Sequence, residues 1–283
     1  MEKKIIDIFK TRLGVEVLEI EDYSKGTMQI VSLVRTDVAN YVIKFPREGR
    51  TSSTHREAFF LEKFKGKIPI PEMVLSTDDY IIQTFVEGDD LSDMDLDEEL
   101  LQKTYTELGQ IFKIIHGFKM EGFGFVNKDG RGEFESLREV LYQYRDEDLA
   151  YIKDNNIITD DEYLRLLDYL DRNDSFADLK ESVLLHFDFE DWNIKVKDGK
   201  VSGIIDFGNL SAGPVAFEFA RPFISGHADK RLEYLLETYG EVDKDELEYF
   251  VIVSLIWMIH RHHKSEKKHK FERNLNVLRS IIN

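Results

Sequence analysis

The segment VLLHFDFEDWNIKVKDGKVSGIIDFG, residues 183–208, constrains the fold of this chain more than any other. It is typical of a strand end, a polar loop, a short strand, a KDGK turn and a second strand that ends just before Asp206. Such a hairpin brings the loop before its first strand and the residue after its second strand to the same end. The sequence therefore predicts that Asp188, Asn193 and Asp206 converge.

These three side chains suggest a particular chemistry. Asn193 and Asp206 offer oxygen ligands, which suit a hard divalent cation such as Mg²⁺ that is shared with substrate phosphates. Asp188 is then left to orient and deprotonate an acceptor hydroxyl. The spacing from His186 through Asp188 to Asn193 matches the H-x-D-x-x-x-x-N loop of protein kinases, and the string D-F-G follows at Asp206. A simple turn explains either string alone, but their joint order and spacing favour phosphoryl transfer.

The first 86 residues are expected to form a small antiparallel sheet with one crossing helix. The strings VEVLEIEDY, MQIVSLVR and NYVIKFP are rich in alternating and β-branched residues, whereas residues 55–64 have helical spacing. Lys44 ends the third string and Glu57 lies in the helix. A strand lysine paired with a helix glutamate is what the kinase pattern requires for binding nucleotide phosphates. The alternatives are a snorkelling strand-end lysine and a solvated helix face.

Two other stretches are candidates for contacting the nucleotide. In YSKGTMQ, residues 23–29, Ser24 and Thr27 are expected to cover the phosphates, although Gly26 is the one glycine there. In IIQTFVEG, residues 81–88, an apolar strand ends in an extended crossover, so Thr84 and Val86 are predicted to meet the purine edge. A strand that merely leaves its sheet is the alternative for this second stretch.

Residues 87–283 are expected to form a larger, mainly helical lobe that carries the catalytic loop and the acceptor site. The acidic stretch EGDDLSDMDLDEEL precedes an amphipathic pattern, and further helical patterns include SLREVLYQYRDEDLAYI, PVAFEFARPFI and ELEYFVIVSLIWMIHRHHK. The last of these places Trp257 in the core, with an acceptor wall as the alternative, and makes His260 and His263 part of a basic helix end. The predicted fold class is α+β, with a nucleotide-binding lobe at 1–86 and a helical lobe at 87–283.

Composition excludes several classes of partner. The formal net charge of −17 argues against nucleic acid, whose phosphates are bound by clustered Lys and Arg. The longest apolar run, FVIVSLIWMI, is too short to span a bilayer, and the absence of cysteine excludes disulfides. We therefore expect a cytoplasmic monomer without a membrane or nucleic-acid partner.

With these residues assembled, the chain resembles the aminoglycoside phosphotransferase-like family, small-molecule kinases of the protein-kinase-like fold. The resemblance implies that Asp188 is the catalytic base, supported by His186, that Asn193 and Asp206 bind Mg²⁺, and that Lys44 contacts the phosphates of ATP or GTP. It also implies that Gly88 is the hinge glycine. The chain departs from the family at Phe187, where a small or polar residue is usual, and at Gly213 and Glu218, where many members have Asp.

The acceptor is expected to be a small hydroxylated molecule. Only NLSAG separates D-F-G from Pro214, which leaves no room for a segment that docks a polypeptide. The acidic composition favours a cationic acceptor, and hence an aminoglycoside antibiotic. Kinases of homoserine, choline, methylthioribose and fructosamine share the same apparatus and are alternatives, as is a nucleotide-binding regulatory protein without transfer activity. The acceptor-binding residues and the choice between ATP and GTP stay open.

Overall fold

The computed structural model describes residues 1–23, 29–48, 52–226 and 230–283. The predicted phosphate-covering residues Ser24 and Thr27 lie outside these ranges. The chain divides into two compact units, each assembled from separate segments: the first comprises residues 1–95, 127–130 and 191–210, and the second comprises 96–126, 131–190 and 211–283. The functional division at residue 86 stays a prediction.

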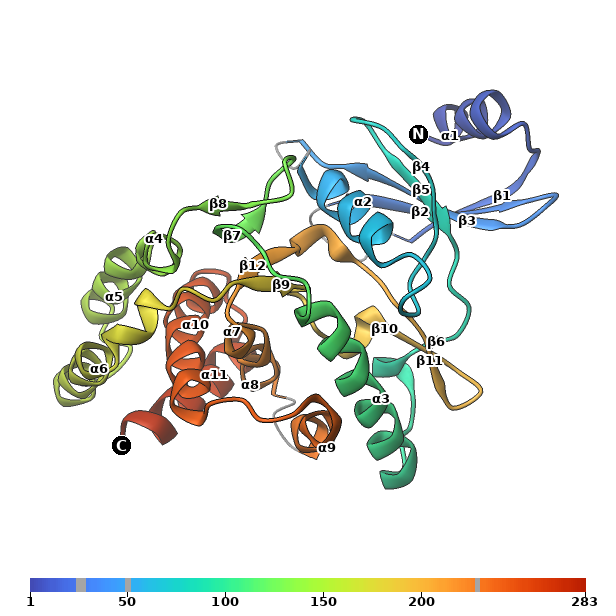
Figure 1. Cartoon of the computed structure of the whole chain (residues 1–283). Coiled ribbons are helices and arrows are strands. Elements are labelled where there is room, and N and C mark those ends of the chain that lie inside the picture. The colour runs from blue at the N-terminus through green and yellow to red at the C-terminus, as the bar shows by residue number, and fades with distance from the viewer. Residues whose placement is uncertain (24–28, 49–51, 227–229) are drawn as a thin grey trace. The chain divides into compact units, whose positions relative to one another are not determined.

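The first unit contains the predicted small sheet and the predicted hairpin (Figure 1). Its helices are α1 (Glu2–Ile8), α2 (Ser52–Phe64) and the short turns η1 (Phe9–Leu13), η2 (Leu91–Asp93), η4 (Asp191–Asn193) and η5 (Phe207–Asn209). Its strands are β1 (Val17–Asp22), β2 (Gln29–Thr36), β3 (Asn40–Pro46), β4 (Met73–Ser76), β5 (Ile81–Thr84), β6 (Asp89–Asp90), β10 (Ile194–Lys197) and β11 (Lys200–Ile204).

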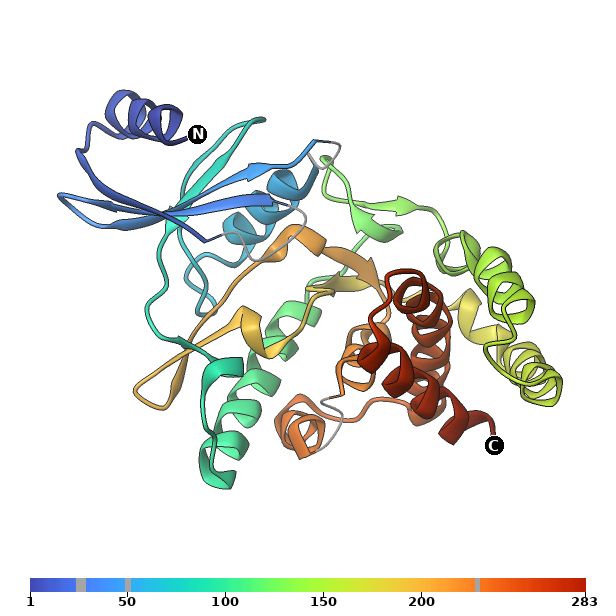
Figure 2. The same cartoon turned by 180° about the vertical axis from the view of Figure 1, so that it is seen from behind.

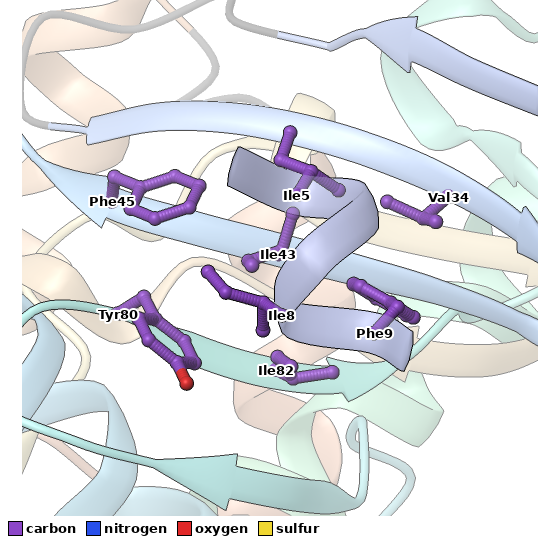
Figure 3. Close-up of a cluster of buried hydrophobic side chains, with 8 residues drawn as sticks. All are labelled: Ile5, Ile8, Phe9, Val34, Ile43, Phe45, Tyr80 and Ile82. Atoms are coloured by element: carbon purple, nitrogen blue, oxygen red, sulfur yellow. The ribbon is translucent and has the colours of Figure 1, made fainter. Parts of the chain in front are cut away.

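The five-stranded sheet of this unit has the order β1-β2-β3-β5-β4, with every neighbouring pair antiparallel. Helix α1 packs its apolar side on this sheet, as Figure 3 shows. The cluster consists of Ile5, Ile8, Phe9, Val34, Ile43, Phe45, Tyr80 and Ile82. Each fully buried side chain of this kind stabilises the fold by about 1.5–3 kcal/mol. The neighbouring Ile6 is 46% exposed and lies outside this cluster.

The hairpin β10–β11 forms as the sequence predicted, whereas the convergence of Asp188 with Asn193 and Asp206 stays a prediction. Ile194 pairs with Ile204, and the turn residues Asp198 and Gly199 both have positive φ, as the favoured two-residue hairpin turn requires. Strand β6 adds to β10 directly after Gly88. A Cβ at Gly88 would lie 2.6 Å from the Val196 carbonyl oxygen, so no larger residue fits there without a shift.

The second unit is mainly helical. Its helices are α3 (Glu98–His116), α4 (Leu137–Tyr142), α5 (Arg145–Asp154), α6 (Asp160–Arg172), η3 (Asp174–Asp178), α7 (Val215–Phe219), α8 (Arg221–Ser225), α9 (Lys230–Tyr239), α10 (Lys244–Lys264) and α11 (Lys268–Ile282). Its strands β7 (Phe123–Val126), β8 (Gly132–Phe134), β9 (Val183–Leu185) and β12 (Ser211–Gly213) form a sheet of order β8-β7-β12-β9. Helices α10 and α11 lie side by side (Figures 1 and 2).

Two helices of this unit are interrupted where the sequence pattern predicted continuity. PVAFEFARPFI forms α7 and α8 instead of one helix, because Pro222 lacks an N–H and is accommodated only in the first turn of a new helix. SLREVLYQYRDEDLAYI likewise forms α4 and α5. Helix α11 is an element that the sequence analysis did not predict. In the described ranges, no helix combines the length and the apolar character needed to cross a membrane.

Candidate active site

Three charged side chains meet in the first unit. Lys44 on β3 and Glu57 on α2 are buried and pair at 2.6 Å between Nζ and Oε1. The Lys44 Nζ also lies 3.8 Å from an Asp206 carboxylate oxygen, at the end of the hairpin. The structure thus brings together a strand lysine, a helix glutamate and the aspartate of D-F-G, which the sequence placed on three separate elements.

The neighbouring carboxylates keep Lys44 protonated. Burial by itself lowers the pKa of the ammonium group, since a dry interior penalises a charge. The carboxylates of Glu57 and Asp206 outweigh this effect, so the pKa of Lys44 lies above its ordinary value. Burial also raises the pKa of the Glu57 carboxyl, an effect that Lys44 opposes. Lys44 is therefore a fixed positive charge inside the first unit.

Helix α2 also holds the D-F-G turn in place. The Arg56 Nε donates a hydrogen bond of 2.7 Å to the Gly208 carbonyl oxygen. The Phe60 and Phe207 rings stack, with centroids 3.7 Å apart and an interplanar angle of 13°. Asp206 itself adopts a left-handed backbone with φ of 67°, a conformation that costs an aspartate energy and persists only where the surroundings hold it.

Asn193 and Asp206 lie at the same end of the hairpin. The Ile205 N–H donates to the Asn193 carbonyl oxygen at 2.9 Å, so the residue before Asp206 is tied directly to Asn193. The Asp206 side chain is 46% exposed, which leaves its carboxylate reachable from solvent. One amide oxygen and one carboxylate form a partial set of hard oxygen ligands that suits Mg²⁺ when phosphate oxygens and water complete the coordination.

Gln29 is a residue of this cluster that the sequence analysis missed. Its Nε2 lies 3.4 Å from the second carboxylate oxygen of Glu57 and 3.4 Å from the Ser53 hydroxyl. Both oxygens of Glu57 therefore have a donor. A glutamine at the start of a strand is ordinarily solvated, so nothing in the sequence indicates that Gln29 contacts Glu57. Its burial, at 4% exposure, is evident only in the structure.

Thr84 and Val86, the two residues predicted to meet the purine edge, lie at the end of β5 and just beyond it. The Thr84 backbone N–H and hydroxyl oxygen make two hydrogen bonds of 2.9 Å with the backbone of Glu72. The Val86 side chain lies against Gly203, where an added Cβ would come within 2.6 Å of it. Their contact with a purine stays a prediction.

In the second unit, Asp188 follows a strained residue. Phe187 has φ of 60°, which is an outlier for a bulky side chain. Its backbone N–H donates to both carboxylate oxygens of Glu218, at 3.0 and 3.2 Å. Glu218 departs from the family's Asp, and it holds the loop from a fully buried position. The Asp188 N–H in turn donates to His186 Nδ1 at 3.2 Å, so His186 lies where it supports the loop.

Arg221 joins Asp188 to a second carboxylate. Its Nη2 lies 3.3 Å from Asp188 Oδ1, and its Nε lies 2.7 Å from Glu190 Oε1. The Ser225 hydroxyl donates to the same oxygen of Glu190. Burial raises the pKa of Glu190, and the guanidinium of Arg221 opposes that rise. Arg221 and Glu190 were not predicted as site residues; the available signal was the one cation, Arg221, in the segment PVAFEFARPFI.

Of the two C-terminal histidines named above, His263 lies exposed in the basic last turn of α10 as expected, whereas His260 differs from the expectation of a solvated helix end. His260 is buried, and its Nδ1 lies 2.5 Å from an Asp148 carboxylate oxygen, a partner that is remote in the sequence. His263 contacts the Tyr151 hydroxyl. Trp257 is 37% exposed and not a core residue as predicted. Among the described residues, no three His, Asp or Glu side chains gather as they would around a metal ion.

Comparison with known proteins identifies the class to which this geometry belongs. Residues 19–250 match the model of the phosphotransferase enzyme family. Over 217 residues the chain is 24% identical to an aminoglycoside 3'-phosphotransferase of Enterococcus faecalis, covering 73% of this chain and 80% of that protein.

Solved structures agree with the family match. A thermostable mutant of aminoglycoside phosphotransferase APH(4)-Ia, in complex with AMP-PNP and hygromycin B, has a TM-score of 0.76 at 17% identity, over 99% of this chain and 98% of the other. Macrolide 2'-phosphotransferase MphH from Brachybacterium faecium has a TM-score of 0.67 at 16% identity, over 98% and 97%. The α+β kinase-like fold predicted from the sequence is confirmed.

The chain belongs to the phosphotransferase enzyme family, the aminoglycoside phosphotransferase-like kinases. It is accordingly an enzyme of the small-molecule kinase class, with an alcohol group as acceptor.

Proposed function

We propose that this enzyme transfers the γ-phosphoryl group of ATP or GTP to a hydroxyl of a small molecule, in a Mg²⁺-dependent reaction. The observation that carries the proposal is the cluster of Lys44, Glu57 and Asp206, with Asn193 at the same end of the hairpin. Family membership favours transfer over a non-catalytic nucleotide-binding role.

On the nucleotide side, Lys44 binds phosphate oxygens and Glu57 fixes its position. Asn193 and Asp206 would hold Mg²⁺, and the bound ion would neutralise charge on the phosphates. Ser24 and Thr27 cover the phosphates, and Thr84 and Val86 contact the base. Little covalent work falls to these residues, because positioning and electrostatic stabilisation supply most of the rate enhancement.

On the acceptor side, Asp188 orients the hydroxyl and accepts its proton. The acceptor oxygen forms a bond to the γ-phosphorus while the bond to the bridging oxygen of the β-phosphate breaks, so the products are a phosphate ester and a nucleoside diphosphate. The hydrogen bonds to Phe187 and Asp188 keep the loop in one conformation for this step. Arg221 holds the Asp188 carboxylate in one orientation.

The names of the relatives support an aminoglycoside as acceptor, as does the net charge of −17. Aminoglycosides are thus the first antibiotics to test. The structures with the same fold also include a macrolide 2'-phosphotransferase, so a macrolide belongs in the panel of acceptors to test. The surroundings of Asp188 help to choose between these two kinds of acceptor, as argued below.

Mass spectrometry tests the proposed function directly. The purified protein is incubated with Mg²⁺, ATP or GTP and a panel of hydroxylated acceptors, and products are searched for the mass of an added phosphoryl group. Asp188→Asn should lower the turnover number by about 10²–10⁴-fold, the usual contribution of a positioned general base. Nucleotide affinity, measured by calorimetry with AMP-PNP, should stay within about twofold, since Asp188 binds the acceptor and not the nucleotide.

The matched control is Asp198→Asn, which makes the same change at an exposed aspartate in the turn of the β10–β11 hairpin. Asparagine tolerates the positive φ at this position, so the hairpin should be retained. Equal turnover in Asp188→Asn and the parent protein would contradict the assignment of the base. Formation of a phosphorylated product without Mg²⁺ would contradict the role of Asn193 and Asp206.

A further inference from the structure

The second unit contains a cavity of about 190 Å³ that no part of the proposed chemistry uses. Its walls are mainly apolar and come from helices α4, α5, α7, α8 and α10, from β7 and from the loop before Asp188. The aromatic members include Phe125, Phe187, Phe217 and Trp257. Phe187 contacts Phe125 and Phe217 edge to face, with interplanar angles of 89° and 74°. A cavity with such walls favours an apolar, flat occupant.

This cavity adjoins the predicted base within one unit. Phe187, which lines it, is the residue immediately before Asp188. Arg221, which also lines it, lies 3.3 Å from Asp188 Oδ1. Asp188 is not among the described lining residues, so a molecule in the cavity contacts Phe187, which precedes the predicted base, and Arg221, which pairs with it.

The charges of the lining do not suit a polycation. Among the described residues that line the cavity, Asp148 is the one carboxylate, and it is buried and bonded to His260 at 2.5 Å. Two guanidinium groups, those of Arg145 and Arg221, also line the cavity. Each is already paired with a carboxylate, Arg145 with Asp174 at 3.5 Å and Arg221 with Glu190 at 2.7 Å. An ammonium group in the cavity would lose its hydration and would find no unpaired carboxylate among the described lining residues.

The volume sets the size of the group that fits. A dry apolar cavity of about 150 Å³ is large enough to bind benzene. The present cavity of about 190 Å³ therefore has room for one ring and not for the several amino-substituted rings of an aminoglycoside.

We propose that the acceptor of this enzyme is a hydroxylated molecule with an apolar, ring-sized group, and that this group binds in the cavity beside Asp188 and Arg221. The inference rests on the proposed function and narrows it, because it selects an amphiphilic alcohol over a polycationic amino sugar. Trp257, which the sequence placed in the core, becomes a wall of the acceptor site.

Binding is tested first, with matched probes and without any need for turnover. The chain has two tryptophans, so Trp192→Phe leaves Trp257 as the single fluorophore. In the presence of Mg²⁺ and AMP-PNP, phenyl β-D-glucoside should shift the emission of Trp257 in a saturable manner. Methyl β-D-glucoside, which differs only by the apolar ring, and kanamycin should bind at least tenfold more weakly.

Two variants locate the binding site by calorimetry and steady-state kinetics. Trp257→Ala should weaken phenyl β-D-glucoside binding at least tenfold and raise its KM in a nucleoside-diphosphate release assay, while AMP-PNP affinity is unchanged. Leu167→Ala is the matched control, because Leu167 on α6 is also 37% exposed and does not line the cavity. It should leave both quantities as they are in the parent protein.

The outcomes separate this inference from the proposed function. If kanamycin is phosphorylated and binds more tightly than the phenyl probe, or if Trp257→Ala has no effect on that probe, the inference is wrong and the proposed function stands. If the phenyl probe binds in the cavity but is not phosphorylated, the assignment of the cavity to the acceptor is overturned. If in addition no acceptor of the panel is phosphorylated while AMP-PNP still binds, the proposed transfer reaction is overturned as well.

Discussion

The two compact units use the same arrangement of charges with different side chains. In the first, Lys44 lies between Glu57 at 2.6 Å and Asp206 at 3.8 Å. In the second, Arg221 lies between Glu190 at 2.7 Å and Asp188 at 3.3 Å. In each case a cation is fixed by a buried glutamate and faces an aspartate that is more accessible.

The difference between the two arrangements lies in their burial. The Lys44 side chain is 6% exposed and part of a sheet, whereas the Arg221 side chain is 27% exposed at the edge of a cavity. Breaking an enclosed ion pair leaves a buried charge without a partner and therefore destabilises the fold. At a cavity edge, water can solvate the charge that is left when its partner is lost. Removal of Lys44 should therefore lower the stability of the fold more than removal of Arg221 does. Removal of Arg221 should show its main effect in the turnover number.

The largest expected effect is that of Lys44→Ala on stability. The substitution leaves Glu57 buried without its cation, and breaking a buried pair on one side costs about 3–5 kcal/mol. Urea unfolding of the purified protein measures this loss. The control is Lys197→Ala in the same unit, whose pair with Glu87 is exposed on both sides and should contribute less than about 1 kcal/mol. Equal losses in the two variants would remove the distinction drawn between enclosed and exposed cations.

Arg221→Ala is expected to lower turnover strongly and stability only moderately. Without the guanidinium, the Asp188 carboxylate loses its fixed orientation, and misplacement of a catalytic group by about 1 Å can lower turnover about 10²-fold. AMP-PNP affinity should not change, and the loss in urea stability should be smaller than that of Lys44→Ala. Arg221→Lys should recover only part of the turnover, because one ammonium cannot replace the two nitrogens that reach Asp188 and Glu190 separately.

A matched control for Arg221 is Arg172→Ala in the same unit. Arg172 pairs with Asp168 on the surface of α6, and both side chains are largely exposed. This variant should retain the turnover and stability of the parent protein. If Arg221→Ala instead lowers stability as much as Lys44→Ala and leaves turnover intact, Arg221 has a structural role alone.

The same contrast explains how much of the site the sequence could predict. Lys44 and Glu57 are 13 positions apart on a strand and the next helix, and Asn193 and Asp206 flank one hairpin, so local rules were enough to bring each pair together. Arg221 and Glu190 are 31 positions apart, and their pairing depends on the break between α7 and α8. Periodicity predicted the apolar pattern of that segment but not the break, and it therefore missed the cation beside Asp188.

The cavity was missed for a related reason. Its lining residues come from five helices, one strand and a loop. The apolar pattern of each of these segments, taken alone, is typical of a packed core. A hydrophobic helix pattern does not distinguish a side chain that fills a core from one that lines a hollow, because both lie on the apolar side. Trp257 shows the ambiguity: its position in α10 predicted burial, and tertiary packing leaves it 37% exposed.

A smaller effect is expected from Glu218→Gln, which tests the support of the catalytic loop. The neutral amide keeps one acceptor oxygen, but the charged bond to the strained Phe187 N–H is lost, and such bonds contribute about 1.5–3 kcal/mol. Stability should fall by up to this amount, and turnover should fall without a change in AMP-PNP affinity. Glu218→Asp keeps the charge and should recover turnover more fully than Glu218→Gln. A loss of stability with unchanged turnover would show that the loop does not need this bond for transfer.

The smallest expected effect is a pH dependence in the second unit. Burial lowers the pKa of His262 to about 4, assisted by the positive charges of Lys270, Lys267, Arg273 and Arg221. The unfolded chain takes up the proton near pH 6.5, while the folded protein leaves His262 neutral until about pH 4. Its contribution to stability is therefore fully present above pH 6.5 and is lost as the pH falls toward about 4.

Urea unfolding at about pH 7 and about pH 5 in the parent protein and in His262→Gln measures this contribution. Carboxylates titrate in both proteins alike, so the difference between their pH dependences isolates His262, and the parent should lose more stability on acidification. His269→Gln, at an exposed position on α11, is the control and should behave as the parent does. Because Arg221 is one of the cations that lower this pKa, Arg221→Ala should raise the pKa of folded His262 toward 6.5, so the acid-induced loss of stability should be smaller and should be complete at a higher pH. An unchanged pH profile in that variant would mean that the charge of Arg221 is fully neutralised by Asp188 and Glu190.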